Sequence, residues 1–143
     1  MEKVFGLIGA AVSHSFSKSY FDEKFFREGL RDYHYELFPL SNIKEIEKLL
    51  KDTKGLSGLN VTIPYKEQVL KYLDEVDGFA KKIGAVNVIK IKDGKLKGFN
   101  NTIRGGIDFF FSEKSIRSIY VSRFRNGNTL FLYCRIFKTY ESK

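Results

Sequence analysis

The order of apolar segments constrains the fold of this chain most strongly. Short apolar runs typical of β-strands cover residues 4–8, 33–38 and 59–63. Apolar residues at helical spacing follow each run, in residues 17–29, 41–55 and 64–73. Alternation of strands and helices predicts parallel strands joined by crossover helices, because each helix returns the chain to the edge of the sheet where it started.

The next part of the chain changes this pattern. We predict a helix over residues 74–83 and a strand over residues 84–91. Asp93-Gly94 then leads into a further strand over residues 96–99, and a two-residue turn of this composition joins antiparallel strands. The predicted fold is therefore α/β: a mixed, mainly parallel open sheet flanked by helices on both faces, with an antiparallel hairpin near residues 86–99.

Length and composition limit the class of protein. A chain of 143 residues with 43% hydrophobic residues suits a single globular domain. Its apolar runs are far shorter than the roughly 18 residues that a membrane helix needs, and no signal-peptide core is visible, so we expect a cytoplasmic protein without membrane contact. One cysteine, Cys134, and two histidines without ligand spacing, His14 and His34, argue against a disulfide framework and a metal site.

The net charge of +8 raises the question of nucleic-acid binding. Residues 1–103 carry 17 Lys and Arg against 14 Asp and Glu, whereas residues 104–143 carry 8 against 3. Most of the excess therefore lies in the last part of the chain. Lys and Glu alternate on the predicted helices, as on a solvated surface, and we do not expect a nucleic-acid partner.

Polar residues recur where the predicted strands end. Ligands of open α/β sheets bind at the carboxyl ends of the strands, so we expect these side chains to meet in one pocket. Their hydroxyl, amide and ammonium groups suit a small ligand with several hydroxyls and a carboxylate. The residues are Ser15 and Ser17 after the first strand, Asn60, Thr62 and Lys66 around the end of the third, Asn87 before the hairpin, and Thr102 after it.

Each of these residues also has a purely structural interpretation. Lys66 lies at the start of a predicted helix and could exchange a proton with a ligand, or it could be a surface lysine beside Glu67. Ser15 and Ser17 precede a helix, where serine is also typical of capping. Asn87 is harder to explain structurally, because an amide within an apolar strand needs hydrogen-bond partners. No glycine-rich stretch has the spacing of a dinucleotide-binding loop.

Four blocks of sequence together resemble the substrate-binding domain of shikimate dehydrogenases, over about residues 4–106. These blocks are GAAVSHSFS (residues 9–17), NVTIPYKE (residues 60–67), GAVNV (residues 84–88) and GFN (residues 98–100). Shikimate dehydrogenases reduce 3-dehydroshikimate to shikimate with NADPH. The resemblance implies that Ser15 and Ser17 bind the substrate carboxylate, and that the ring and its hydroxyls are surrounded by Asn60, Thr62, Lys66 and Asn87.

The sequence departs from the family at one catalytic position. In the family, the lysine that matches Lys66 works with an aspartate from a Gly-x-Asn-Thr-Asp motif. Residues 98–102 here read GFNNT, so Thr102 stands where the aspartate is expected. Thr102 can hydrogen-bond to a substrate but cannot exchange a proton near neutral pH. We therefore expect Lys66 to be the catalytic residue and Thr102 to contribute to binding.

The last part of the chain does not resemble the family's nucleotide-binding half. We expect a substrate-binding domain over residues 1–106 and an atypical tail over residues 107–143, with no NADPH site in this chain. A change of reading frame near Asn100 would explain the tail, because back-translation of residues 124–127, FRNG, allows Leu-Gly-Thr-Gly one base along. A natural variant tail that packs as a helix or strand is the alternative.

Two functions remain open at this point. The first is the substrate-binding half of an NADPH-dependent shikimate dehydrogenase, inactive by itself. The second is a binding module that holds shikimate-like cyclohexene carboxylates without turnover. The sequence determines neither the oligomeric state nor the preference between shikimate and quinate.

Overall fold

The computed structural model of the chain describes residues 1–100, 118–126 and 129–137. The chain divides into two compact units, residues 1–100 and residues 101–143. In the second unit, β7 (Ser118–Asn126) and β8 (Thr129–Phe137) form an antiparallel pair. The predicted boundary between residues 106 and 107 lies outside the described residues, so the division at that point stays a prediction.

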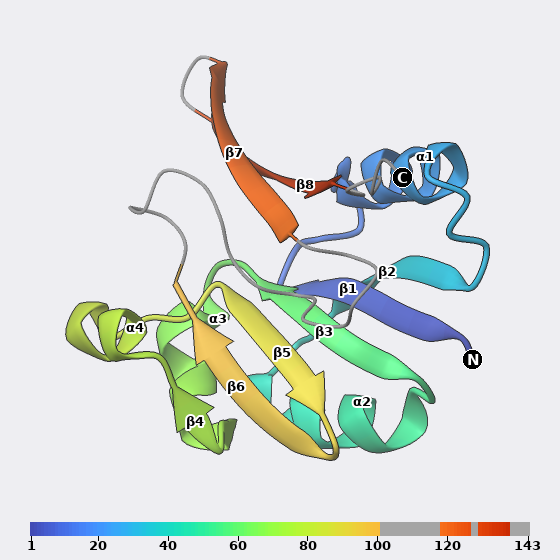
Figure 1. The fold of residues 1–143 in the computed structure, drawn as a ribbon. Coiled ribbons are helices and arrows are strands. Elements are labelled where there is room, and N and C mark those ends of the chain that lie inside the picture. The colour runs from blue at the N-terminus through green and yellow to red at the C-terminus, as the bar shows by residue number, and fades with distance from the viewer. Residues whose placement is uncertain (101–117, 127–128, 138–143) are drawn as a thin grey trace, which may run out of the picture. The chain divides into compact units, whose positions relative to one another are not determined.

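The first unit consists of six strands and four short α-helices (Figure 1). Its strands are β1 (Lys3–Gly9), β2 (Tyr33–Pro39), β3 (Leu56–Val61), β4 (Glu75–Val76), β5 (Val88–Lys92) and β6 (Lys95–Phe99). Its helical segments are α1 (Ser17–Arg27), the 3-10 turn η1 (Ile43–Glu45) leading into α2 (Ile46–Asp52), α3 (Tyr65–Gln68) continued by the 3-10 turn η2 (Val69–Tyr72), and α4 (Gly78–Ile83).

The six strands form one mixed sheet in the order β2-β1-β3-β5-β6-β4. Strand β1 runs parallel to both β2 and β3, and β4 runs parallel to β6. Strand β5 is antiparallel to β3 and to β6. The hairpin turn between β5 and β6 has positive φ at Asp93 (52°) and Gly94 (75°). The predictions of a mixed, mainly parallel sheet and of this hairpin are confirmed.

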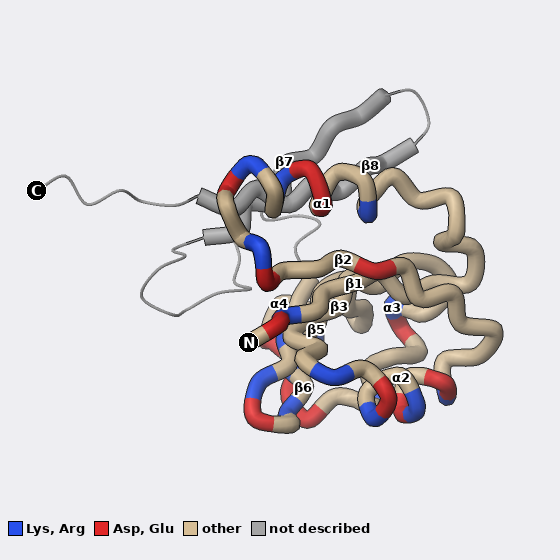
Figure 2. Tube along the Cα trace, turned by 90° about the vertical axis from the view of Figure 1, so that its right-hand side faces the viewer, with Lys and Arg blue, Asp and Glu red and all other residues tan. Residues whose placement is uncertain are grey.

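Helices cover both faces of the sheet, as predicted. Helix α1 lies on the opposite side of strands β1–β3 from α2 (Figure 2). Lys and Arg alternate with Asp and Glu along α1 and α2. Most of these side chains are exposed, as on solvated outer faces, whereas Lys24 of α1 is buried. The α1 side is packed by aromatic rings: Phe25 meets Phe5 at 6.2 Å and Tyr33 at 5.6 Å between ring centroids.

The opposite face of the sheet holds the main aliphatic core. Ile8, Leu59 and Ile89 come from the three central strands β1, β3 and β5, and none of them has exposed surface. Ile46 of α2 and Val69 of η2 close over them. Burial of apolar side chains of this size is the main driving force for folding, at roughly 1.5–3 kcal/mol each.

Three predictions of where strands and helices begin and end were wrong. Glu75 and Val76 lie within the predicted helix over residues 74–83, but they form β4 because they pair with the edge of β6. Gly84 was predicted to start a strand, but it ends α4 at a left-handed φ of 72°. Ile63 was predicted to lie in a strand, but it follows β3 and is 74% exposed. Asn42 caps the second helical segment by accepting from the Lys44 amide at 3.0 Å.

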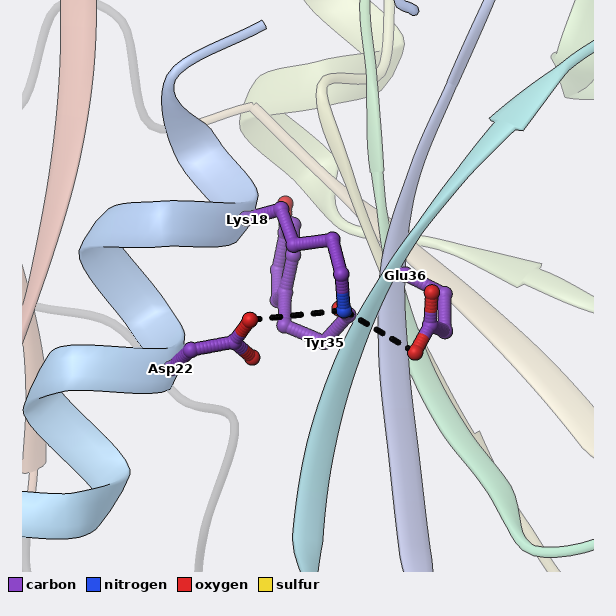
Figure 3. A network of polar contacts seen from close by, with 4 residues as sticks. All are labelled: Lys18, Asp22, Tyr35 and Glu36. Carbon is purple, nitrogen blue, oxygen red and sulfur yellow. Dashed lines mark hydrogen bonds and ion pairs between the residues drawn. The ribbon is translucent and has the colours of Figure 1, made fainter.

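A lysine at the start of α1 anchors this helix to the edge strand β2 (Figure 3). Lys18 Nζ donates to the Tyr35 carbonyl oxygen at 2.8 Å and to Glu36 Oε1 at 3.0 Å, and it lies 3.3 Å from Asp22 Oδ2. Partial burial works against the charge of Lys18, but the hydrogen bond to Glu36 and the carboxylates of Asp22 and Glu36 outweigh it. The pKa of Lys18 is therefore raised above its ordinary value.

Replacing Lys18 by methionine tests this anchor. The Lys18 side chain is 39% exposed, so solvent screens the interaction and we expect Lys18→Met to lower the free energy of unfolding by at most about 1 kcal/mol near neutral pH. A raised pKa in the folded state means that this contribution is complete below the ordinary lysine pKa and is lost as the pH rises through the raised value. Denaturant unfolding at pH 7 and near pH 11 measures it.

The matched control is Lys48→Met, which removes an exposed lysine of α2. Its free energy of unfolding should follow that of the unmodified chain at both pH values. The loss of unfolding free energy in Lys18→Met, relative to the unmodified chain, is expected to be smaller near pH 11 than at pH 7. An equal loss at both pH values would show that the lysine charge does not hold α1 on β2.

Candidate functional site

The sheet order brings the ends of four strands to one edge. Strands β1 and β3 are parallel, so both end at this edge, at Gly9 and Val61. Strand β5 is antiparallel to β3, so β5 starts where β3 ends, with Asn60 opposite Val88. Strand β6 is antiparallel to β5 and ends at the same edge, with Phe99 opposite Val88. We call this the ligand edge of the sheet.

Backbone hydrogen bonds fix Asn87 and Lys66 at the ligand edge. The Asn87 carbonyl accepts from the Val61 amide at 2.9 Å, and the Asn87 amide donates to the Phe99 carbonyl at 3.0 Å. The Lys66 carbonyl accepts from the Val86 amide at 2.7 Å, which ties α3 to the segment before β5. Asn87 and Lys66 therefore lie on segments that are bonded to each other and to the end of β3.

Thr62 is placed by a close approach between β1 and the turn after β3. The Thr62 amide donates to the Ile8 carbonyl at 2.9 Å. A Cβ atom on Gly9 would come within 2.5 Å of Thr62 Cγ2 and 2.7 Å of Val12 Cγ1. Only glycine fits at position 9 without moving Thr62, so this glycine serves the packing of the ligand edge.

Ser15 and Ser17 form a local hydrogen-bonded pair at the start of α1. Ser15 Oγ accepts from the Ser17 amide at 3.2 Å and donates to Ser17 Oγ at 3.0 Å. The cap position of α1 is Phe16, whose side chain makes no capping bond, so the expectation that Ser17 caps the helix was wrong. Both serines are half-buried, with their hydroxyl groups side by side.

Asn60 has a partner that the sequence did not indicate. Its Nδ2 donates to the Tyr35 hydroxyl at 2.7 Å, although Tyr35 belongs to β2 and Asn60 to β3. The Tyr35 ring stacks on Phe21 of α1, with centroids 4.2 Å apart and planes 13° from parallel. Strand alternation could have placed Tyr35 on the α1 face, but only the strand order shows that it reaches Asn60 across β1.

The remaining polar residues of the ligand edge differ in burial. Asn87 is buried, with 4% exposure. Asn100, which follows β6, is also buried, and its Nδ2 donates to the Ala85 carbonyl at 2.9 Å. Lys66 is half-buried, and no carboxylate in the described part of the chain forms an ion pair with it. Thr102 lies outside the described residues.

The described residues offer little for a nucleotide or a metal. Gly6 and Gly9 lie in β1, and an added Cβ at Gly6 would meet the Phe38 ring at 2.4 Å, so strand packing accounts for both glycines. Within residues 1–100, 118–126 and 129–137, no group of three or more His, Cys, Asp or Glu residues is placed to hold a metal ion. None of the helices in those ranges is long and apolar enough to cross a membrane.

The first unit is an α/β domain with polar side chains at one edge of its sheet, and comparison with known proteins identifies the family. A family model described as the shikimate dehydrogenase substrate binding domain matches residues 7–89. The NADP(+)-dependent shikimate dehydrogenase of Methanocaldococcus jannaschii is 48% identical over 100 residues, which cover 68% of this chain and 35% of that protein. The chain belongs to the shikimate dehydrogenase substrate-binding domain family.

Solved structures agree with this assignment. The crystal structure of a shikimate dehydrogenase in complex with NADP+ has a TM-score of 0.62 and 46% identity, covering 69% of this chain and 34% of that one. The shikimate 5-dehydrogenase of Thermus thermophilus, solved in complex with shikimate, has a TM-score of 0.65 and 33% identity. The match covers 72% of this chain and 39% of that one. The chain thus spans little more than a third of the length of these relatives.

The contact between Gly9 and Thr62 yields a test of the ligand edge. Gly9→Ala should lower the free energy of unfolding by about 1–3 kcal/mol, because the new methyl group overpacks the β1–β3 junction. Denaturant unfolding measures the loss. Gly78→Ala is the control: nothing lies within 4 Å of an added Cβ there, and alanine suits the first turn of α4. Equal unfolding free energies for the two variants would contradict this account of Gly9.

Proposed function

We propose that residues 1–100 form the part of an NADP-dependent shikimate dehydrogenase that binds shikimate and 3-dehydroshikimate. The observation that carries this proposal is the ligand edge, where polar groups from distant parts of the chain sit on strands and turns bonded to one another. The family match and the relatives solved with shikimate support the choice of ligand. A cyclohexene ring with hydroxyls and a carboxylate needs this mixture of hydroxyl, amide and ammonium groups.

In this proposal each polar residue has a distinct role. The adjacent hydroxyl groups of Ser15 and Ser17 donate to the substrate carboxylate. The oxygens on the substrate ring form hydrogen bonds with Asn60, Thr62 and Asn87. The expectation that Thr102 contributes a further hydroxyl stays a prediction, because this residue lies outside the described residues.

Lys66 is the proposed catalytic residue. Its ammonium has no carboxylate partner among the described residues, which leaves its protons available to a substrate oxygen. In the reaction of the family, this group would hold and exchange the proton of the oxygen that changes between carbonyl and hydroxyl. Thr102 in place of an aspartate removes the second proton-exchanging group, so we expect binding to be better preserved than turnover.

We propose that the described residues do not hold NADPH. The family uses it as the hydride donor, but the glycines near the start of the chain serve strand packing rather than a phosphate cradle. We therefore propose that the described unit binds substrate and does not itself bind the cofactor. The frame change proposed for residues 107–143 is tested by sequencing the gene downstream of the Asn100 codon.

Thr102 favours a second candidate function, a binding module for shikimate-like acids that performs no chemistry. Both candidates predict shikimate binding. Only the first predicts shikimate-dependent reduction of NADP+ once Thr102 is replaced by aspartate and the nucleotide-binding half of a relative is supplied. In either case we expect a cytoplasmic protein whose partner is a small molecule rather than a nucleic acid or a membrane.

Calorimetric titration of the full chain with shikimate tests the proposal. We expect saturable binding, weakened severalfold by Lys66→Ala because one charge-assisted hydrogen bond is lost. Lys48→Ala removes a lysine of the same charge from the outer face of α2 and should leave the affinity unchanged. Absence of binding by the unmodified chain would overturn the proposed function. An NADP+ reduction assay on the Thr102→Asp chain, supplied with the nucleotide-binding half of a relative, separates the dehydrogenase from the binding module.

A further inference from the structure

We propose that Tyr35 is a positioning residue that orients the Asn60 side chain toward the substrate. Tyr35 also connects Asn60 to helix α1, which begins with Ser17. This inference rests on the proposed function, because Asn60 is taken there as a substrate-binding residue. Tyr35 is 2% exposed and lies on an edge strand, away from the four strand ends that form the ligand edge. Its influence on a ligand therefore passes through another side chain.

Tyr35 is fixed at three points. Its backbone carbonyl accepts from Lys18 Nζ at 2.8 Å (Figure 3). Its ring is stacked on Phe21 at 4.2 Å. Its hydroxyl, at the far end of the ring, accepts from Asn60 Nδ2 at 2.7 Å. A buried tyrosine held at its backbone, ring and hydroxyl has little freedom to turn, so it is a rigid support for the Asn60 amide.

The bond to Tyr35 holds the Asn60 amide in one orientation. An asparagine amide carries two donors on Nδ2 and an acceptor on Oδ1. With Nδ2 directed at the Tyr35 hydroxyl, Oδ1 points away from Tyr35, and no donor among the described residues is bonded to it. Asn60 is thus set to accept a hydrogen bond from a ligand hydroxyl group. Without the tyrosine hydroxyl, the Asn60 amide could rotate and present either Nδ2 or Oδ1 to a ligand.

The same tyrosine connects the two groups of binding residues. Phe21 and Lys18 belong to α1, whose first residue is Ser17, whereas Asn60 lies in β3 beside Thr62. Tyr35 therefore connects the proposed carboxylate-binding pair, Ser15 and Ser17, to the proposed ring-binding amide of Asn60. The stacked ring is retained in a phenylalanine variant, so the hydroxyl can be tested apart from the packing.

A double-mutant cycle between Tyr35 and Asn60 tests the inference. Tyr35→Phe, Asn60→Ala and the double variant are each titrated with shikimate in the full chain. We expect Tyr35→Phe to weaken binding about tenfold when Asn60 is present and less than twofold when Asn60 is replaced, because Tyr35 acts only through Asn60. The same loss in both backgrounds, or no loss in either, would overturn the inference.

Tyr65→Phe is the matched control. Tyr65 is also buried, and its hydroxyl donates to the Leu40 carbonyl at 2.6 Å, so this variant loses a buried tyrosine hydroxyl bonded to backbone rather than to a proposed binding residue. We expect its shikimate affinity to match that of the unmodified chain. A tenfold loss here as well would mean that general destabilisation explains the effect of Tyr35→Phe.

A second readout needs no ligand, so it separates this inference from the proposed function. Hydrogen exchange of the Asn60 side-chain amide, followed by NMR in the free chain, should be severalfold faster in Tyr35→Phe and unchanged in Tyr65→Phe. Unchanged exchange in Tyr35→Phe would overturn the positioning role. If the unmodified chain fails to bind shikimate while this difference in exchange is present, the proposed ligand is wrong and the orientation of Asn60 by Tyr35 is supported.

Discussion

The antiparallel pairing of β5 with β3 is the constraint on which the rest of the ligand edge depends. Because β5 runs against β3, the chain enters β5 at the edge where β3 ends, and Asn87 is bonded between Val61 and Phe99. A parallel β5 would carry Asn87 to the opposite edge of the sheet. The hairpin with β6 then returns the chain to the same edge, and the Lys66 carbonyl joins α3 to it.

The two faces of the sheet have different tasks. The face covered by α2 and η2 is mainly aliphatic and fully buried at its centre. The face covered by α1 is aromatic, and the Tyr35 hydroxyl on this face accepts a hydrogen bond from Asn60. A tyrosine suits this position because its ring packs in the core while its hydroxyl forms a directed bond.

Much of the fold could be predicted from the sequence, because it depends on local patterns. The strand and helix periodicity indicated the α/β alternation, and Asp93-Gly94 indicated the hairpin, since a turn of this type requires positive φ. The two residues of β4 could not be predicted, because only pairing with β6 makes them a strand. Tyr35 was missed for a related reason: its contact with Asn60 depends on the strand order, which no local pattern contains.

The central claim is that one edge of the sheet binds a small hydroxylated acid. A crystal structure of the chain grown with shikimate tests this claim most directly. The account predicts the shikimate carboxylate against Ser15 and Ser17, and the ring oxygens within hydrogen-bond distance of Asn60, Lys66 and Asn87. Shikimate bound at another surface, or these side chains directed to different faces of the domain, would contradict it.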